Sequence, residues 1–369
     1  MTQVTKISTL NDLRRLAVTQ SLFAPTSLNK ALDRLGFVQA DPIRAPARAQ
    51  DLILRHRVKD YRAGQLEARY ARLAVEEDFF VNYGFVSPSL YGLMHPRTAE
   101  RKFTPTEHRR AADLRAFVAE RGVVHPREAD AHFAHGAAKN GWGGSSNATT
   151  DLLDRMHYRG MLRVAGRIKG IRLYTLPRVE HSVRDAVGAD AALDQLIDVL
   201  FEKYAPLAAN SMSGLLNRLR WGVPQWRGRV PAAIARAKAR HPSAVIDGVR
   251  WYWPAGNAPL CDVDDRVRLL APFDPVVWDR TRFEMLWGWA YRFEAYTPAA
   301  KRKLGYYALP VLWREHIIGW ANAAVDDGRL QVQIGFVAGR APRDKLFKAA
   351  LQGEVNQLAA FLAVSSAPM

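Results

Sequence analysis

Residues 35–43 read LGFVQADPI, and they close a stretch with the pattern of a short amphipathic helix. Ser27 is a favoured N-cap residue, and Gly36 lies where a glycine commonly follows the last helical turn. Between them, apolar residues recur at helical spacing, at Leu28, Ala31, Leu32 and Leu35. The residues after Gly36 predict a short strand, in which alternate side chains share one face. Gln39 and Asp41 should therefore point the same way.

Two interpretations of this polar pair are open. A run of arginines follows the strand, at Arg44, Arg48, Arg55 and Arg57. Guanidinium groups suit bidentate phosphate contacts, so Gln39 and Asp41 fit a small polar site beside a phosphate-binding surface. The segment also fits a half-exposed strand at the edge of a domain.

The first 105 residues predict a winged-helix module. A helix over residues 10–20 is broken at Pro25 and is followed by the helix and strand described above. Helix, short break, helix, glycine and strand form the outline of a helix-turn-helix that leads into a wing. Residues 47–61 predict a further helix that is basic on one side, and residues 62–95 are rich in aromatic side chains.

A second module is predicted over residues 106–180. Its pattern gives a helix that ends at Gly122, a strand near 123–126, a helix over 127–133, a glycine-rich loop over 141–147 and a helix that ends near Gly160. Residues 162–176 alternate on both sides of a glycine-rich turn, which predicts a hairpin wing. The wing is basic, with Arg163, Arg167, Lys169 and Arg172.

The rest of the chain predicts a third module over 181–265 and a different domain over 266–369. The third module has helical patterns and then a hairpin around Asp247 and Gly248. From residue 266, strand patterns occur at 267–270, 306–312, 316–324 and 330–336, before a final helix over 345–362. The predicted fold class is therefore α+β: three tandem winged helix-turn-helix modules followed by a β-rich C-terminal domain.

The charge balance favours a polyanionic partner. The 369 residues include 53 Lys and Arg against 36 Asp and Glu, which leaves a formal charge of +17 and a pI near 10.2. Such a surplus attracts nucleic acid or, less specifically, an acidic membrane surface, although an arginine-rich composition is also a habit of GC-rich genomes. A single cysteine, Cys261, excludes a disulfide framework and a cysteine-based zinc site. Without an apolar signal segment or membrane span, we expect a soluble, cytoplasmic protein.

Few sequence motifs point to chemistry on their own. No glycine-rich phosphate loop, HExxH motif or Gly-x-Ser-x-Gly elbow occurs in the sequence. One acidic cluster has the composition of a metal-dependent nuclease site, but it also fits turn caps and ion pairs: Asp262, Asp264, Asp265, Asp274 and Asp279. Lys301 and Arg302 lie among tyrosines in a segment that fits either a nucleic-acid contact or a solvated loop.

Four stretches together carry a family resemblance. They are LGFVQADPI at 35–43 with ARAQ at 47–50, GWGGSS at 141–146, LAPFDPVVWDR at 270–280 and YRFEAYTPAAKR at 291–302. In this order they resemble the YcaQ/AlkZ family of winged-helix DNA glycosylases over nearly the whole chain. The catalytic motif of that family is Gln-x-Gln in one branch and Gln-x-Asp in the YcaQ-like branch, and Gln39 and Asp41 are similar to the latter.

The resemblance implies tandem winged-helix modules and a β-rich part around a basic DNA-binding face, with excision of N-alkylated bases and, in some relatives, unhooking of interstrand crosslinks. It implies no cofactor or metal, and a monomer that acts on double-stranded DNA carrying alkylated bases in the bacterial cytoplasm, near the nucleoid. The catalytic pair would be Gln39 and Asp41. The predicted DNA-binding residues are Arg44, Arg48, Gln50, Arg55, Arg57, Ser145, Ser146, Asn147, Arg163, Arg167, Lys169, Lys301 and Arg302.

The chemistry of the two residues agrees with this reaction. A purine alkylated at N7 or N3 is cationic, so it can leave without a general acid, and the barrier lies in positive charge on the sugar and in delivery of water to C1′. The carboxylate of Asp41 can stabilise that charge and orient the water, while the amide of Gln39 can hold water or sugar. The alternatives are a non-catalytic winged-helix transcriptional regulator and, third, a metal-dependent nuclease.

Overall fold

The computed structural model describes residues 7–139, 145–255 and 262–366. The chain forms two compact units, each built from separate stretches of sequence. Unit 1 comprises residues 1–66, 197–216 and 234–369, and unit 2 comprises residues 67–196 and 217–233. In the described part of the chain, no helix is long and apolar enough to span a membrane. The predicted boundaries at 105, 180 and 265 stay predictions.

The N-terminal elements of unit 1 follow the predicted order. Helix α1 (Leu10–Ser21) begins at a Thr9 capping box, and α2 (Leu28–Leu35) begins at the Ser27 cap. Gly36 then adopts a φ of +62°, a left-handed conformation that favours glycine, and β1 (Phe37–Gln39) follows. The helix predicted over 47–61 is shorter: α3 (Ala49–Leu54) has six residues, all of them buried.

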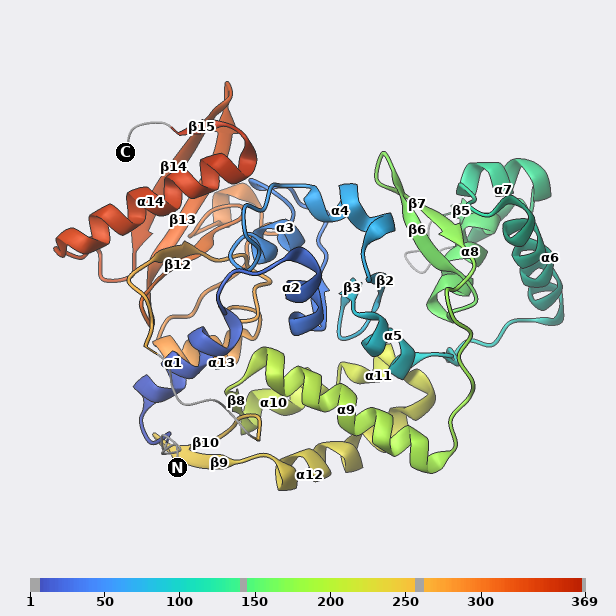
Figure 1. Ribbon diagram of the computed structural model, residues 1–369, viewed down its shortest axis with the longest axis horizontal. Helices are drawn as coiled ribbons and strands as arrows, with labels where there is room; N and C mark the ends of the chain where they lie inside the picture. The colour runs from blue at the N-terminus through green and yellow to red at the C-terminus, as the bar shows by residue number, and fades with distance from the viewer. Residues whose placement is uncertain (1–6, 140–144, 256–261, 367–369) are drawn as a thin grey trace. The chain divides into compact units, whose positions relative to one another are not determined.

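A five-stranded sheet dominates the C-terminal part of unit 1, as predicted (Figure 1). Its strands are β11 (Val267–Leu269), β12 (Leu309–Trp313), β13 (His316–Asp326), β14 (Arg329–Phe336) and β15 (Ser365–Ser366), in that order. Helix α14 (Lys345–Leu362) lies against the sheet, where Phe347 contacts Trp313. The structure adds a helix that the sequence patterns did not predict, α13 (Arg280–Trp287).

A second, three-stranded sheet of unit 1 contains the hairpin predicted around Asp247 and Gly248. Strands β8 (Leu207–Ala208), β9 (Ser243–Ile246) and β10 (Val249–Tyr252) lie in the order β8-β10-β9. Asp247 and Gly248 both have positive φ, as the tight turn of such a hairpin requires. The helices around it are α9 (Ala186–Tyr204), α10 (Ala209–Leu216) and α12 (Val230–Arg240), of which α9 and α12 contribute residues to both units.

Unit 2 opens with short elements and then contains the predicted second module. The first group is α4 (Gln65–Arg69), which begins at the end of unit 1, η1 (Tyr70–Arg72), β2 (Glu76–Phe79), β3 (Tyr83–Val86) and α5 (Pro88–Met94). The module follows with α6 (Pro105–Arg121), α7 (Pro126–Phe133), β4 (Ala137–Lys139), β5 (Ser145–Asn147), α8 (Ala148–Tyr158), β6 (Arg163–Ile168) and β7 (Ile171–Thr175). Unit 2 ends with α11 (Leu219–Gly222) and η2 (Pro224–Arg229).

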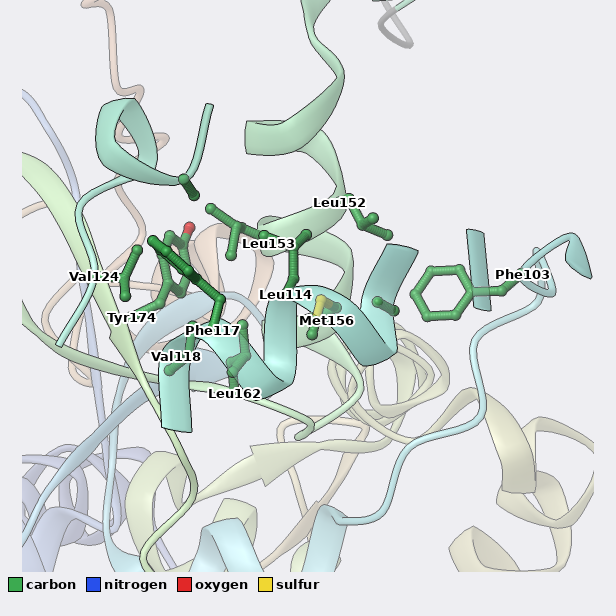
Figure 2. Packing of buried hydrophobic residues seen from close by; sticks show 12 residues of the cluster. Phe103, Leu114, Phe117, Val118, Val124, Leu152, Leu153, Met156, Leu162 and Tyr174 are labelled. Carbon is green, nitrogen blue, oxygen red and sulfur yellow. The ribbon is translucent and has the colours of Figure 1, made fainter. Parts of the chain in front are cut away.

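The second module has the element order of a winged helix. Val124 forms an isolated antiparallel bridge with Tyr174 of β7, so the segment between α6 and α7 joins the β6–β7 hairpin. Figure 2 shows the core that these elements share, in which Leu114, Phe117 and Leu153 pack around the ring of Tyr174. The helices and wing of this stretch confirm the predicted elements. The number of such modules in the chain stays a prediction.

Candidate active site

Gln39 is held by an indole. All three residues of β1 are buried, and Gln39 is only 5 % exposed, so the interpretation as a half-exposed edge strand is wrong. Trp278 Nε1 donates a hydrogen bond of 2.7 Å to Gln39 Oε1. An indole N–H can only donate, so it selects the oxygen of the amide and leaves the NH₂ group of Gln39 free to face another partner. The carbonyl of Phe37, at the start of β1, accepts a hydrogen bond from Lys203 Nζ.

Asp41 lies just beyond the strand and is half-buried. Its Oδ1 accepts a 2.9 Å hydrogen bond from the backbone N–H of Ile43. Burial raises the pKa of Asp41, and the hydrogen bond from Ile43 opposes that shift. Among the described residues nothing donates to Oδ2 of Asp41. The carboxylate thus has one oxygen fixed by its own turn and one oxygen available to another group.

Helix α3 supports the backbone of this turn. The N–H of Asp41 donates to Gln50 Oε1 at 3.4 Å, and Gln50 is buried. The next residue, Asp51, accepts a 2.7 Å bond from the hydroxyl of Tyr61, which in turn accepts from the N–H of Leu66. Gln50 therefore holds the backbone of the candidate site, and its contact with DNA stays a prediction.

Arg57 and Asp274 form a buried ion pair that positions Trp278. Arg57 is 0 % exposed, and its two terminal nitrogens reach the two oxygens of Asp274 at 2.8 and 3.0 Å. Arg57 Nε also donates to the carbonyl of Ser21, at the end of α1. The carbonyl of Asp274 accepts from the N–H of Trp278 at 2.8 Å, so the pair anchors the turn that carries the indole. Arg57 is fully buried in this ion pair, and its predicted contact with DNA stays a prediction.

Tyr307 is close enough to Asp41 for the charge of the carboxylate to act on its hydroxyl. Tyr307 is buried, and its hydroxyl has no hydrogen-bond partner among the described residues. Burial and then the charge of Asp41 raise the pKa of Tyr307 well above its usual value. The ring packs edge-to-face on Phe293 at 5.3 Å. Tyr307 is thus a buried hydroxyl that remains available close to the carboxylate of Asp41.

The loop before Tyr307 is ordered by a single carboxylate. Glu294 accepts from the N–H groups of Lys303, Leu304 and Gly305, and these bonds lower its pKa although burial opposes that shift. Lys301 is exposed on this loop, and Arg302 donates to the carbonyl of Thr297. The basic side chains predicted to meet DNA here are therefore on a defined loop.

The wing arginines are not free. Arg163 is buried and pairs with Glu76 at 2.7 Å, and Arg167 binds Glu77 with both Nε and NH2. Both acids belong to β2 and are themselves buried. Their pairing compensates the charge of both arginines and leaves Arg167 only partly exposed, and the DNA contacts of Arg163 and Arg167 stay predictions. Lys169, by contrast, is exposed at the tip of the hairpin.

The remaining predicted contacts fall into four groups. Arg44 is exposed and Arg48 half-buried beside the candidate site, and both stay predictions. Asn147 caps α8 through a 2.9 Å bond from the N–H of Thr150. The side chains of Ser145 and Ser146 lie outside the described residues, as do residues 140–144 of the glycine-rich loop. Arg55 is inward-facing and forms an ion pair with Glu354, and its contact with DNA stays a prediction.

The acidic cluster has structural partners. Asp264 pairs with Arg266 and Arg268, and the other members pair or cap as the turn interpretation predicts: Asp262 with Arg15, Asp265 with Arg314, Asp274 with Arg57, and Asp279 as the cap of α13. Among the described residues no group of three or more His, Cys, Asp or Glu is arranged to hold a metal ion. The structural interpretation of these acids is confirmed.

Comparison with known proteins identifies the family. The structure is similar to that of the DNA glycosylase AlkZ of Streptomyces sahachiroi, with a TM-score of 0.65 and 16 % identity over 98 % of this chain and 99 % of that chain. Residues 32–361 match the family described as DNA glycosylase AlkZ-like. The chain belongs to the AlkZ-like DNA glycosylase family. Membership makes it a DNA glycosylase with DNA as its partner, which excludes the non-catalytic regulator.

Neither Trp278 nor Tyr307 was predicted as a functional residue of this AlkZ-like glycosylase. Trp278 appears in the sequence analysis only within the motif at 270–280 and Tyr307 only within the strand predicted over 306–312, because Gln39 and Trp278 are more than 230 residues apart in sequence. The sequence signal that could have pointed to Trp278 is the motif at 270–280, which contains it.

Replacing Trp278 with Phe should lower base excision about fivefold and leave DNA affinity unchanged. The substitution removes one neutral hydrogen bond, of about 1 kcal/mol, and lets the amide of Gln39 rotate. Single-turnover rates measure the effect, and Trp313→Phe is the matched control, since it lies on β12 away from Gln39. Equal rates for Trp278→Phe and the wild type would contradict the assigned role of the indole.

Proposed function

We propose that this AlkZ-like glycosylase hydrolyses the N-glycosidic bond of cationic N-alkylated purines, such as N7-alkylguanine, and does so without cleaving the DNA strand. The observation that supports the proposal best is that a hydrogen-bond acceptor and a hydrogen-bond donor, both fixed in position, lie two residues apart in the chain. Asp41 is a half-buried carboxylate with one oxygen free, and Gln39 is an amide whose oxygen is occupied by Trp278. The NH₂ group of Gln39 is then a directed donor.

In this mechanism the positive charge of the alkylated base drives its departure. An alkylated purine leaves as a neutral molecule, so no acid has to protonate it. Positive charge develops on the sugar instead, and a carboxylate in a partly dehydrated site stabilises such charge strongly. Asp41 would face the sugar, orient the attacking water and take its proton, as one carboxylate does in glycoside hydrolysis. Gln39 would hold the water or a sugar oxygen through its NH₂ group.

The duplex would be held by basic side chains that the structure leaves exposed or half-buried. We propose Arg44 and Arg48 next to the site, Lys169 at the wing, and Lys301 and Arg302 on the loop held by Glu294. In an interstrand crosslink formed through alkylated purines, the leaving group is again a cationic purine. We propose such crosslinks as further substrates. A monomer acting on alkylated double-stranded DNA remains part of this proposal.

A comparison of a cationic lesion with a neutral lesion tests whether the enzyme is restricted to cationic purines. We expect free base to be released from a duplex that contains N7-methylguanine and not from the same duplex with hypoxanthine at that position. Hypoxanthine is a neutral purine and needs protonation before it leaves. Equal release of both bases would show that the enzyme supplies an acid, which contradicts the proposed mechanism.

The excision rate should depend on the protonation of Asp41. Burial raises the pKa of this carboxyl above its ordinary value of 3.8, and the ionised form is the active one. Below the raised pKa the rate should therefore fall tenfold per pH unit, and above it the rate should be constant. The measurement is a single-turnover pH profile corrected for enzyme-free base loss. A rate that increases as the pH falls through this region would contradict the role of the carboxylate.

Removing the charge at the wing tip should weaken DNA binding without changing the reaction. Lys169→Gln deletes one exposed cation, so the slope of log K against log salt should decrease by about 0.9. Lys348→Gln, an equal change on the exposed face of α14, is the control. The slopes are measured by fluorescence anisotropy on undamaged duplex. An identical slope for both variants and the wild type would remove Lys169 from the DNA contact.

A further inference from the structure

Unit 1 contains a basic cavity of about 320 Å³ that the glycosylase site does not use. It lies where the segment after α3 meets β11 and α14. Five cationic side chains line it against two carboxylates: Arg55, Lys59, Arg62, Arg266 and Arg268, with Asp60 and Glu354. Its volume is at the small end of the range for ligand sites.

Some of these cations are already compensated. Asp264 binds both Arg266 and Arg268, and Glu354 binds Arg55. Lys59 and Arg62 are exposed and form no ion pair with a described residue. The cavity therefore has surplus positive charge on the side of Lys59 and Arg62.

A second observation that points to an anion in this cavity is the buried Nε of Arg55. Its side chain is 4 % exposed, yet its Nε is buried without a hydrogen-bond partner among the described residues. A buried guanidinium N–H without a partner is costly, and an anionic oxygen is its natural acceptor. His56 beside it is neutral, because burial and the charge of Arg55 lower its pKa well below the usual value. The histidine thus adds no competing charge.

An apolar wall closes the cavity. Tyr61 and Phe361 stack with ring centroids 6.2 Å apart, and Arg55 lies over the ring of Phe361 at 5.8 Å. This wall reduces the exposure of a bound anion to water, which strengthens its attraction to the cations.

We propose that the cavity binds a phosphate group, held by Arg55, Lys59 and Arg62. The phosphate belongs either to a small ligand, such as a nucleoside monophosphate, or to the backbone of bound DNA. In both cases the same groups act: the Nε of Arg55 donates to a phosphate oxygen, and the two exposed cations neutralise its charge. The proposal does not depend on the chemistry at Asp41.

Binding of free phosphates tests the first source. Isothermal titration of the full chain with inorganic phosphate and with deoxyguanosine monophosphate, at constant ionic strength, is expected to show binding. The double variant Lys59→Gln/Arg62→Gln should bind at least tenfold more weakly, and both changes are at exposed positions that tolerate them. The matched control is Lys345→Gln/Lys348→Gln on α14, which should bind as the wild type does.

Salt dependence of DNA binding tests the second source. If the phosphate is that of DNA, the free probes do not bind, and the double variant lowers the slope of log K against log salt by about 1.8, whereas the control pair does not. Loss of probe binding or loss of slope, confined to the double variant, supports the proposal. Unchanged probe binding and slope in the double variant, or equal losses in the control, would overturn it. Because excision of N7-methylguanine is measured separately, failure here leaves the proposed function intact.

Discussion

Replacing Asp41 with Asn should lower single-turnover base release by about 10²–10⁴-fold, the range for loss of a general base, while DNA affinity stays the same. Asparagine has nearly the shape of aspartate and can still accept the bond from Ile43. It has no negative charge, so it neither stabilises the cationic sugar nor takes a proton from water. The effect should therefore appear in the rate of the chemical step, measured with enzyme in excess over N7-methylguanine duplex.

A matched variant separates charge loss at the site from charge loss elsewhere. Asp327→Asn makes the same change at an exposed residue of unit 1 whose φ is +44°, a conformation that asparagine tolerates. We expect its excision rate to equal that of the wild type. Undiminished excision by Asp41→Asn, or an equal loss in Asp327→Asn, would contradict the role of Asp41.

Replacing Arg57 with Met should destabilise the protein by about 3–5 kcal/mol, the usual cost of breaking a buried ion pair. Asp274 would then be left at 0 % exposure with its charge uncompensated. Arg57 also donates to Ser21 at the end of α1 and to the carbonyl of Ile53 in α3, so three segments lose their common anchor. The free energy of unfolding is measured by urea titration.

The double variant Arg57→Met/Asp274→Leu shows whether the cost comes from the orphaned charge. With both partners apolar, no buried charge remains, and we expect much of the lost stability to return. Arg44→Met, an exposed arginine close in sequence, should change the free energy of unfolding by less than about 0.5 kcal/mol. A loss below about 1 kcal/mol for Arg57→Met would contradict the anchoring role of the pair.

The elements with local signals could be predicted from the sequence. Ser27 and Gly36 delimit α2 correctly because caps act on the neighbouring backbone. The Asp247–Gly248 turn and the strands of the C-terminal sheet follow from period-two patterns and turn chemistry. The same local reasoning missed α13, whose sequence follows a proline-rich turn and has no clear apolar stripe.

The sequence does not show the acidic partners of these arginines, because each partner is distant in sequence. Asp274 is 217 residues from Arg57, and Glu77 is 90 residues from Arg167. Composition presents each arginine as a free cation, and only the fold brings the acid to it. The same limit hid Trp278 and Tyr307, which reach Gln39 and Asp41 from the C-terminal part of the chain. The candidate pair, Gln39 and Asp41, could be named from the sequence because both residues lie in one short motif, and its catalytic role stays a prediction.

Release of free base by the wild-type enzyme, from an N7-methylguanine duplex in the presence of EDTA, tests the central claim most directly. Chromatography of the supernatant before any strand-breaking treatment detects the base, and an undamaged duplex of the same sequence is the control. We predict free 7-methylguanine and an intact strand that carries an abasic site. No free base, or release that requires an added divalent metal, would contradict metal-independent hydrolysis by Gln39 and Asp41.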